Sequence, residues 1–351
     1  MNKIKLLDDT LINKIAAGEV IDRPSSVVKE LVENSIDAQS TKIMIYIEGG
    51  GVKKIQVRDN GIGIEKNSIS MAFKRHATSK ISKNNDLFNI NTLGFRGEAL
   101  PSIGSISRVL IESSHNKRDG YSTNINYGKI DDIQPSSIST GTNIVITDLF
   151  TNVPARMKFL KTEKTELNLI YKYLKKVFIS FPGIHFILNV NNKEIYNLIP
   201  VSLINRINEI FSDIKDNLIP ISYSHSSFKI SGYIGNLTTL KKSNSEQFLF
   251  VNNRSIKSIS LNKTIMNCFQ NLISRGEYPF YSIFIDIDPK EIDINVHPQK
   301  SEIKFKNEWV LIQNLSTAVK VALKNKIHVL PRYSNKYNYD SANNFQQSRL
   351  N

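Results

Sequence analysis

The sequence predicts an α+β fold with two domains, in which helices cover one face of a mixed sheet. Two observations predict it. Alternating apolar runs typical of strands are interleaved with amphipathic helical stretches, and a second series of this kind starts near residue 200. A chain of 351 residues is long enough to bury two cores. We expect domains at 1–200 and 201–331, and a polar, aperiodic tail at 332–351 that begins a disordered linker.

Both domains can be divided into expected elements. The first should contain, in chain order, a helix over 29–38, a hairpin of 43–47 and 52–58, a helix from about 68, a glycine-rich loop over 93–100, strands between 108 and 146, a basic helix over 165–177 and a strand over 184–190. The second should contain an amphipathic helix after 201, strands over 228–234 and 247–251, a helix over 261–273, strands over 281–287 and 292–296, and a last helix over 308–326.

One face of the first helix carries a line of polar side chains. Glu30, Asn34 and Asp37 recur at i, i+4 and i+7, whereas the apolar residues fall mostly on the other side. A carboxylate one turn from a carboxamide oxygen suits Mg²⁺, which takes oxygen ligands and keeps several waters. The alternative is the solvent-facing stripe of an ordinary amphipathic helix, and the line taken alone favours that alternative.

Three glycine-containing elements follow this helix. Asp59 ends the second hairpin strand, and Gly61 and Gly63 let the backbone pass close to something flat or charged, although Asp-Asn-Gly is also a common turn. The segment 93–100 places two glycines around an arginine before helix-forming residues, and a helix N-terminus offers free N–H groups to phosphate. The third element, 140–143, is too short to mean much alone.

The order of these elements is more specific than any one of them. E-x-x-x-N on a helix, D-x-G-x-G at a strand end, G-F-R-G-E-A and then G-T, all within 142 residues, resemble the ATP-binding set of the ATPase superfamily of gyrase, the heat-shock chaperone, histidine kinases and MutL. The sequence contains no G-x-x-x-x-G-K-[ST], which excludes a P-loop. Further blocks resemble the MutL family of DNA mismatch-repair proteins: Ile15 to Val20, Arg23-Pro24, Arg75 to Lys80, Gly94 to Leu100, Asp148 to Phe150 with Asn152, Pro154 to Arg156, Lys158 to Leu160, and Asn295 to Pro298 with Lys300.

The resemblance implies a Bergerat-type ATP-binding α/β sandwich followed by a domain like domain 2 of ribosomal protein S5. It implies that Glu30 is the general base for the attacking water and that Asn34 is the protein ligand to Mg²⁺. It also implies that Asp59 accepts a hydrogen bond from the adenine amine, in a pocket supported by Gly61, Gly63 and Thr142.

The resemblance assigns further residues to ATP. They are Asp37 on the first helix, Thr78 and Ser79, and the lid residues Gly94, Phe95, Arg96, Gly97, Glu98, Ala99 and Leu100. Lys300, from the second domain, is implied to reach the γ-phosphate and to act in catalysis. His76 and His297 are expected to position Arg75 and Lys300 rather than to act themselves.

The same resemblance implies a coordinator of DNA mismatch repair that is switched by nucleotide and hydrolyses ATP slowly with Mg²⁺. Its partners would be DNA without sequence preference, a MutS-type mismatch recognition protein, a downstream nicking endonuclease, a helicase, and a second copy of the chain in an ATP-driven homodimer. The alternative is an ATP-binding DNA scaffold without significant turnover. No endonuclease domain is expected in this chain, and both a fragment and a naturally shortened protein stay open.

Composition bears on partners and compartment. The net charge of +14 suggests a nucleic-acid partner, although an A·T-rich genome would also enrich lysine. Two basic segments, 156–176 and 241–275, could be solvated lysine-biased faces or a DNA surface. The single cysteine and the lack of a signal or membrane-spanning stretch favour a cytoplasmic protein that joins the nucleoid during repair. The expected DNA contacts are Arg156, Lys158, Arg254 and Lys257, the last two outside the ATP pocket.

Overall fold

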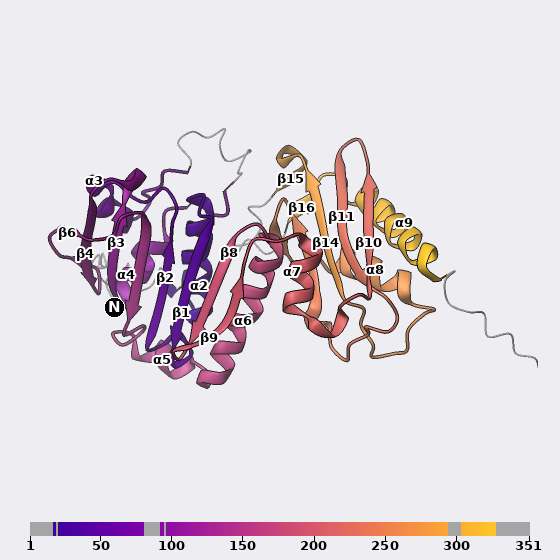
Figure 1. Ribbon diagram of the computed structural model, residues 1–351, viewed down its shortest axis with the longest axis horizontal. Helices are drawn as coiled ribbons and strands as arrows, with labels where there is room; N and C mark the ends of the chain where they lie inside the picture. Colours follow the sequence, from indigo (N-terminus) through magenta and orange to yellow (C-terminus); the bar gives the residue numbers. More distant parts are fainter. Residues whose placement is uncertain (1–16, 19, 81–91, 95, 294–302, 328–351) are drawn as a thin grey trace, which may run out of the picture.

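The computed structural model describes residues 17–327 except for residue 19, the segment 81–91, residue 95 and the segment 294–302. The described residues form two large sheets that lie side by side, the first with strands coloured indigo to pink and the second with strands in salmon to orange, and a two-stranded ribbon (Figure 1). Each sheet carries helices, so the predicted α+β class is confirmed.

The first sheet has nine strands in the order β5-β4-β3-β7-β2-β1-β8-β9, with β6 paired to β4. Its pairings are antiparallel except for β1 with β8, which are parallel. The strands are β1 Lys42–Glu48, β2 Lys54–Asp59, β3 Arg108–Ser114, β4 Gly120–Asn126, β5 Lys129–Ile130, β6 Gln134–Ser136, β7 Gly141–Thr147, β8 His185–Val190 and β9 Lys193–Leu198.

The first hairpin forms as predicted because its apolar residues alternate. Ile43 and Ile45 of β1 are fully buried, and Ile45 faces Val57 of β2 across the ladder. The register pairs Ile43 with Asp59, so the end of β2 comes to rest beside the start of β1. A shift of one residue would turn this whole apolar set toward solvent.

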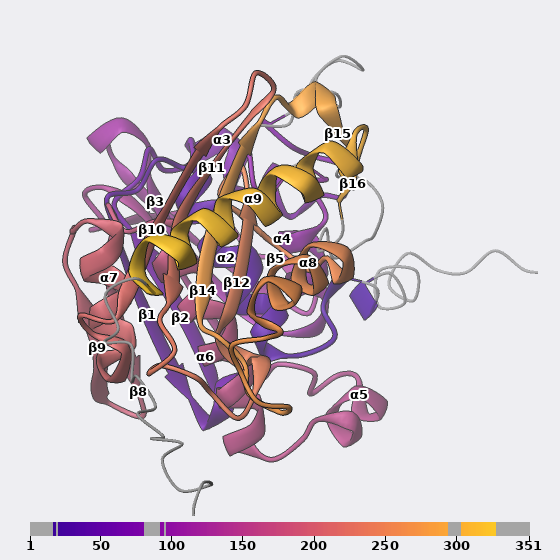
Figure 2. The ribbon, with the colours of Figure 1, turned by 90° about the vertical axis from the view of Figure 1, so that its right-hand side faces the viewer.

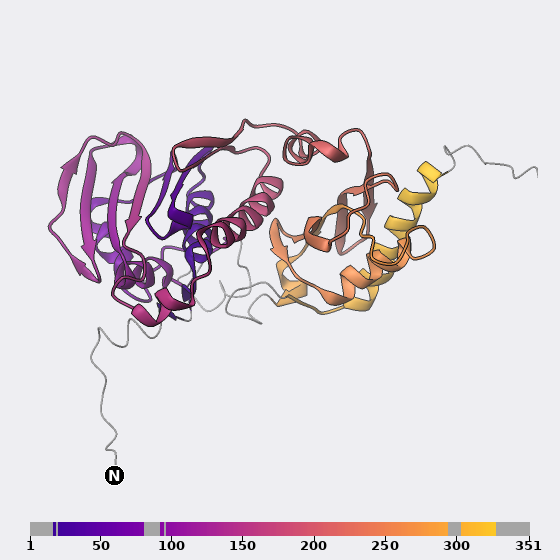
Figure 3. The ribbon, with the colours of Figure 1, turned by 90° about the horizontal axis from the view of Figure 1, so that it is seen from below.

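Helices α2 Pro24–Asp37, α4 Ala99–Ile106 and α6 Glu163–Ser180 cover one face of this sheet, which is visible when the molecule is seen from below (Figure 3). The helix expected from about residue 68 is present as a short segment. Only α3 Lys66–Ile69 and a 3-10 turn over Met71–Phe73 form, because the backbone is already extended at Lys74. The short α5 Pro154–Phe159 precedes α6.

The second sheet has the order β10-β11-β14-β12-β13, and only β12 and β14 pair in parallel. Its strands are β10 Leu218–Ser224, β11 Phe228–Gly235, β12 Gln247–Val251, β13 Arg254–Ile256 and β14 Tyr281–Ile287. Helices α8 Ile259–Phe269 and α9 Glu308–Ile327 lie across one face of it (Figure 2). β15 Ile292–Asp293 and β16 Lys304–Phe305 form a separate ribbon.

Helix α7, Leu203–Ile210, joins the two sheets. The sequence boundary at residue 200 assigns it to the second domain, and its buried Ile207 and Ile210 lie in an apolar core that contains residues of both sheets. Arg206 of α7 is fully buried and donates to the backbone carbonyls of Pro182 at 3.0 Å and Ile199 at 2.7 Å. The same core includes four phenylalanines of the second unit: Phe248, Phe250, Phe280 and Phe284.

Candidate functional site

Helix α2 connects two groups of predicted site residues. Its apolar face is buried in the first core, and helical periodicity places Glu30, Asn34 and Asp37 along a half-buried line beside that face. Ser35, on the same helix, donates its hydroxyl to Asp59 at 2.8 Å. The end of β2 and the polar line of α2 therefore belong to one continuous site.

The carboxylate of Asp59 is buried and already hydrogen-bonded. Its side chain accepts from Ser35 Oγ, from Gly61 N at 2.9 Å and from Thr142 N at 3.3 Å. Burial raises the pKa of Asp59, and these hydrogen bonds oppose the rise. The hydroxyl of Thr142 lies 2.9 Å from Ser113 Oγ, a contact that no sequence motif marks. The structure thus brings Asp59, Gly61 and Thr142 together around one buried carboxylate.

Two predicted glycines are required by close backbone packing. Gly63 has φ +72°, and a Cβ there would lie 2.1 Å from the carbonyl oxygen of Ser114. Gly97 has φ +64°, and its Cβ would lie 2.4 Å from the carbonyl oxygen of Ala77. A side chain is strained in this backbone region and would clash in both places. The second contact sets the segment around Gly97 against the residues just before Thr78.

Glu30, the predicted base, has a partner that sequence analysis missed. Lys29 donates its ammonium to Glu30 Oε1 at 2.7 Å and lies 3.5 Å from Glu33 Oε2. Burial lowers the pKa of Lys29, but Glu33 and Glu30 outweigh it, so the net pKa lies above the ordinary value. The only sequence signal was adjacency, and neighbours on a helix do not normally face each other.

Lys80 holds the predicted magnesium ligand. Its ammonium donates to Asn34 Oδ1 at 2.8 Å and also pairs with Asp37. Among the described residues, no three His, Cys, Asp or Glu side chains gather into a metal-binding group. The amide oxygen of Asn34 is a hard oxygen of the kind that Mg²⁺ takes as a ligand, and in the structure it accepts from the ammonium of Lys80.

Asp37 fixes the start of the predicted lid. Its carboxylate accepts from the backbone N–H groups of Leu93 at 2.8 Å and Gly94 at 3.0 Å. Helix α4 begins at Ala99, directly after Glu98. The lid residues Gly94, Arg96, Gly97, Glu98, Ala99 and Leu100 are thus described, whereas Phe95 lies outside the described residues.

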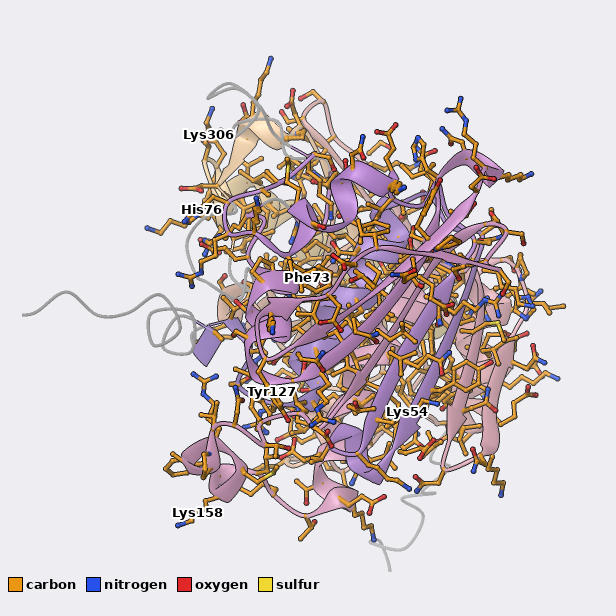
Figure 4. The ribbon with its side chains drawn as sticks, turned by 90° about the vertical axis from the view of Figure 1, so that its left-hand side faces the viewer. Lys54, Phe73, His76, Tyr127, Lys158 and Lys306 are labelled. Atoms are coloured by element: carbon orange, nitrogen blue, oxygen red, sulfur yellow. The ribbon has the colours of Figure 1, made fainter. Side chains whose placement is uncertain are left out.

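The other residues predicted beside the phosphates divide in the same way. Thr78 accepts from the backbone N–H of Lys80 at 3.2 Å, and Ser79 lies between them in the chain. The side chain of His76 is exposed at the edge of the molecule, 3.9 Å from Glu98 (Figure 4). Lys300 and His297 lie outside the described residues.

The expectation that Arg254 lies away from the ATP pocket is wrong. Although it comes from β13 of the second sheet, its guanidinium donates to the carbonyl oxygens of Thr92 at 3.0 Å and Leu93 at 3.2 Å. Burial lowers the pKa of Arg254, and Glu33, Asp37 and Glu30 oppose this change. No local pattern in the sequence could have paired residues 161 positions apart.

Two predicted DNA contacts lie near α5. The guanidinium of Arg156 packs on the backbone of Gly18, where an added Cβ would lie 1.8 Å from it. Burial lowers the pKa of Arg156, and Asp22 opposes the shift. Lys158 is exposed and points outward from α5 (Figure 4).

The fourth predicted DNA contact, Lys257, forms part of a basic group that spans the two sheets. Helix α6 packs against β13, and this packing brings Lys257 close to Lys176 and Lys172 of α6. Burial, followed by the positive charges of Lys257 and Lys172, lowers the pKa of Lys176 to about 8. Sequence analysis missed Lys172 and Lys176 as members of a group with Lys257, because the group exists only where the sheets meet.

Comparison with known proteins now assigns the chain to a family. The family described as histidine kinase-, DNA gyrase B-, and HSP90-like ATPase matches residues 22–154, and the family described as DNA mismatch repair protein, C-terminal domain, matches residues 207–324. The chain belongs to the MutL family. This is also the family that the motifs resemble.

Several MutL proteins are clear relatives. The DNA mismatch repair protein MutL of Clostridium perfringens strain 13 is 44% identical over 327 residues, covering 92% of this chain and 48% of that protein. MutL of Clostridium tetani is 44% identical over 316 residues, covering 89% and 51%. The chain therefore spans about half the length of the curated relatives it matches.

Solved structures agree with the fold. The Aquifex aeolicus MutL ATPase domain complexed with ADP superposes with a TM-score of 0.60 at 25% identity, covering 77% of this chain and 94% of that one. The N-terminal domain of a DNA repair protein gives a TM-score of 0.79 at 24% identity, covering 91% and 100%, and shows the fold alone. Within the described part of the chain, no helix has the length and apolar character needed to cross a membrane.

Proposed function

We propose that this chain binds ATP with Mg²⁺, hydrolyses it slowly, and serves as the nucleotide-switched part of a DNA mismatch repair coordinator. The observation that carries the proposal is the hydrogen bond from Ser35 to Asp59. It ties a buried carboxylate suited to an adenine amine to the helix whose polar face carries Glu30 and Asn34. A base pocket and a phosphate end thereby share one rigid element.

In the proposed mechanism, Asp59 accepts from the exocyclic amine of adenine and disfavours guanine, whose carbonyl would face a carboxylate. Glu30 takes a proton from the attacking water, and Lys29, 2.7 Å away, orients its carboxylate. Asn34 is the residue that would hold Mg²⁺, and that ion, when bound, supplies neutralisation of the charge that develops on the phosphate oxygens. Thr78, Ser79 and the backbone of the Gly94–Leu100 segment are proposed to contact phosphate.

Two further residues belong to this proposal. The ammonium of Lys80 neutralises the Asn34–Asp37 end of the helix here, and a phosphate would offer it an alternative partner. Lys300 is proposed to reach the γ-phosphate from the second domain, which would make hydrolysis depend on how the domains sit.

The test is single-turnover hydrolysis of ATP by the wild type and by Glu30→Ala. Turnover should fall by at least about a hundredfold while ATP still binds, since the carboxylate acts on water rather than on the nucleotide. Asn34→Ala should instead weaken Mg²⁺-dependent binding. Glu194→Ala, which removes an exposed carboxylate on β9, is the matched control.

Each outcome of this test separates the two candidate functions. Hydrolysis that is lost in Glu30→Ala and kept in Glu194→Ala supports the ATPase. ATP binding without turnover in the wild type would favour the ATP-binding DNA scaffold. Turnover at the wild-type rate in Glu30→Ala would falsify the assignment of the base.

We further propose that DNA phosphates contact the basic group of Lys172, Lys176 and Lys257, with Lys158 as a more distant contact. Three lysines contributed by two sheets offer charge without base-edge recognition, which favours binding without sequence preference. The resemblance adds a MutS-type recognition protein, a nicking endonuclease, a helicase and an ATP-driven homodimer as proposed partners. Because the chain spans about half of its relatives, these partners are proposals for this chain.

A further inference from the structure

A guanidinium from the second sheet holds the backbone at the start of the lid. Arg254 donates to two successive carbonyl oxygens, those of Thr92 at 3.0 Å and Leu93 at 3.2 Å. A planar guanidinium is suited to two parallel hydrogen bonds of this kind, which fix orientation as well as distance.

The same short segment is held from the opposite side by helix α2. While its carbonyls accept from Arg254, the N–H groups of Leu93 and Gly94 donate to the two carboxylate oxygens of Asp37. The backbone at 92–94 is therefore placed between one side chain of the ATP helix and one side chain of the second sheet. Losing either partner would leave polar backbone groups without their hydrogen bonds.

Arg254 also faces the acidic face of α2. The charges that act on it most strongly are those of Glu33, Asp37 and Glu30, in that order, and Glu33 is buried. Lys29 pairs with Glu30 and Glu33 and Lys80 pairs with Asp37, so with Arg254 three cations face the three carboxylates. Guanidinium and carboxylates in a partly buried setting interact more strongly than an exposed pair would.

The base of Arg254 is firmly anchored. Arg254 pairs with Val251 across the β12–β13 hairpin. In the turn between them, the backbone carbonyl of Asn253 accepts a short hydrogen bond from Ser180 at the end of α6, and the amide of Asn252 donates to Ile287 at 2.8 Å. The turn is thus fixed to both sheets, and a rotation of the second sheet would move the guanidinium with it.

We propose that Arg254 is a positioning residue through which the second domain holds the backbone at 92–94 in register with the polar face of α2. The proposal rests on the proposed ATPase function, because it makes the geometry of the ATPase site depend on the position of the second domain. Arg254 touches neither nucleotide nor water in this scheme, since it acts through Thr92, Leu93 and Asp37.

The test compares Arg254→Ala, Arg254→Lys and the control Arg118→Ala, which removes an exposed arginine of the first domain. Hydrogen exchange of a peptide covering 92–94 is measured beside a β1–β2 peptide. In Arg254→Ala we expect faster exchange at 92–94 only. We also expect turnover to fall about tenfold, as for loss of one charge-assisted hydrogen bond. Arg254→Lys keeps the charge and one donor, so it should recover part of both.

The readouts separate this proposal from a general structural role. Exchange at 92–94 equal to that of Arg118→Ala overturns it, as does unchanged turnover despite faster exchange. Faster exchange in the β1–β2 peptide of Arg254→Ala would indicate that the whole domain is destabilised. In that case Arg254→Lys, which keeps the charge, is judged by the same two measurements, exchange at 92–94 and turnover. A wild type that neither binds nor hydrolyses ATP would overturn the proposed function. The exchange comparison would still test whether Arg254 holds the backbone at 92–94.

Discussion

The base pocket and the phosphate end of the site are built in different ways. Around Asp59 the partners Ser35, Gly61 and Thr142 all belong to one domain, and the carboxylate is only 8% exposed. At the other end, Asp37 depends on a loop that Arg254 of the second sheet also holds. Under the proposed function, recognition of the base is expected to be insensitive to domain position, whereas the geometry for hydrolysis is expected to respond to it.

This difference fits a nucleotide switch. In the proposed switch, the residues around Asp59 would keep hold of the nucleotide while the residues proposed to contact phosphate change their arrangement. The basic group of Lys172, Lys176 and Lys257 lies at the same junction as Arg254, because β13 packs against α6 there. DNA bound across this group would favour one position of the second domain. DNA binding and ATP binding would then be coupled, each changing the affinity for the other.

The largest expected effect sharpens the comparison at the base pocket. Asp59→Asn keeps the shape of the side chain but replaces one acceptor oxygen with a donor, which would face either the hydroxyl of Ser35 or the backbone N–H groups of Gly61 and Thr142. We expect nucleotide affinity to fall about a hundredfold, as for loss of a buried charge-assisted hydrogen bond with unpaired groups left behind. Isothermal titration with ADP measures it.

The control for this change is Asp132→Asn, which alters an exposed carboxylate. Wild-type ADP affinity in Asp59→Asn would show that the carboxylate does not recognise the base. Loss of affinity in both variants would point to an effect on folding instead.

An intermediate effect concerns the junction. Double reversal Lys172→Glu and Lys257→Glu should weaken DNA binding uniformly across sequences and flatten the dependence of log K on log salt by about 2, one for each lost phosphate contact. Arg254 is left unchanged in this variant, although the sequence predicts it as a DNA contact, because it donates to the backbone at the start of the lid. Filter binding over a salt series measures the slope.

Lys158→Glu, on the outward-facing α5, serves as the comparison for the junction. A smaller loss there than in the double variant would agree with DNA lying across the two sheets. An unchanged slope in the double variant would place the DNA path elsewhere on the surface.

The smallest expected effect is a pH dependence of DNA binding. The pKa of Lys176 is about 8, so its ammonium is mostly charged at pH 7 and mostly neutral at pH 9. DNA phosphate favours the charged form, so affinity should fall as pH rises through 8, by about threefold for one weakened contact. Lys176→Arg stays charged over this range and should remove the dependence. A wild-type curve that is flat from pH 7 to 9 would exclude Lys176 as a contact.

Local patterns determined much of this protein. The polar line on α2, the alternation in β1 and β2, and the spacing of Leu311, Leu315, Val319 and Leu323 on α9 follow from periods of 3.6 and 2 residues, which any sequence displays directly. For the same reason β12 and β14 form over the predicted residues. The residues proposed for base recognition and for proton transfer lie within such local motifs.

Tertiary structure alone decided the partners of those residues. Four of these interactions depend on how helices and sheets pack: Lys29 with Glu30, Lys80 with Asn34, buried Arg206 with backbone carbonyls, and Arg254 with the backbone at the start of the lid. Arg254 was wrongly expected to lie away from the ATP site. An arginine in sequence looks the same whether it will meet solvent, a phosphate or a backbone carbonyl. Its environment is set by contacts between segments more than a hundred residues apart, here 161, and such contacts leave no periodic trace.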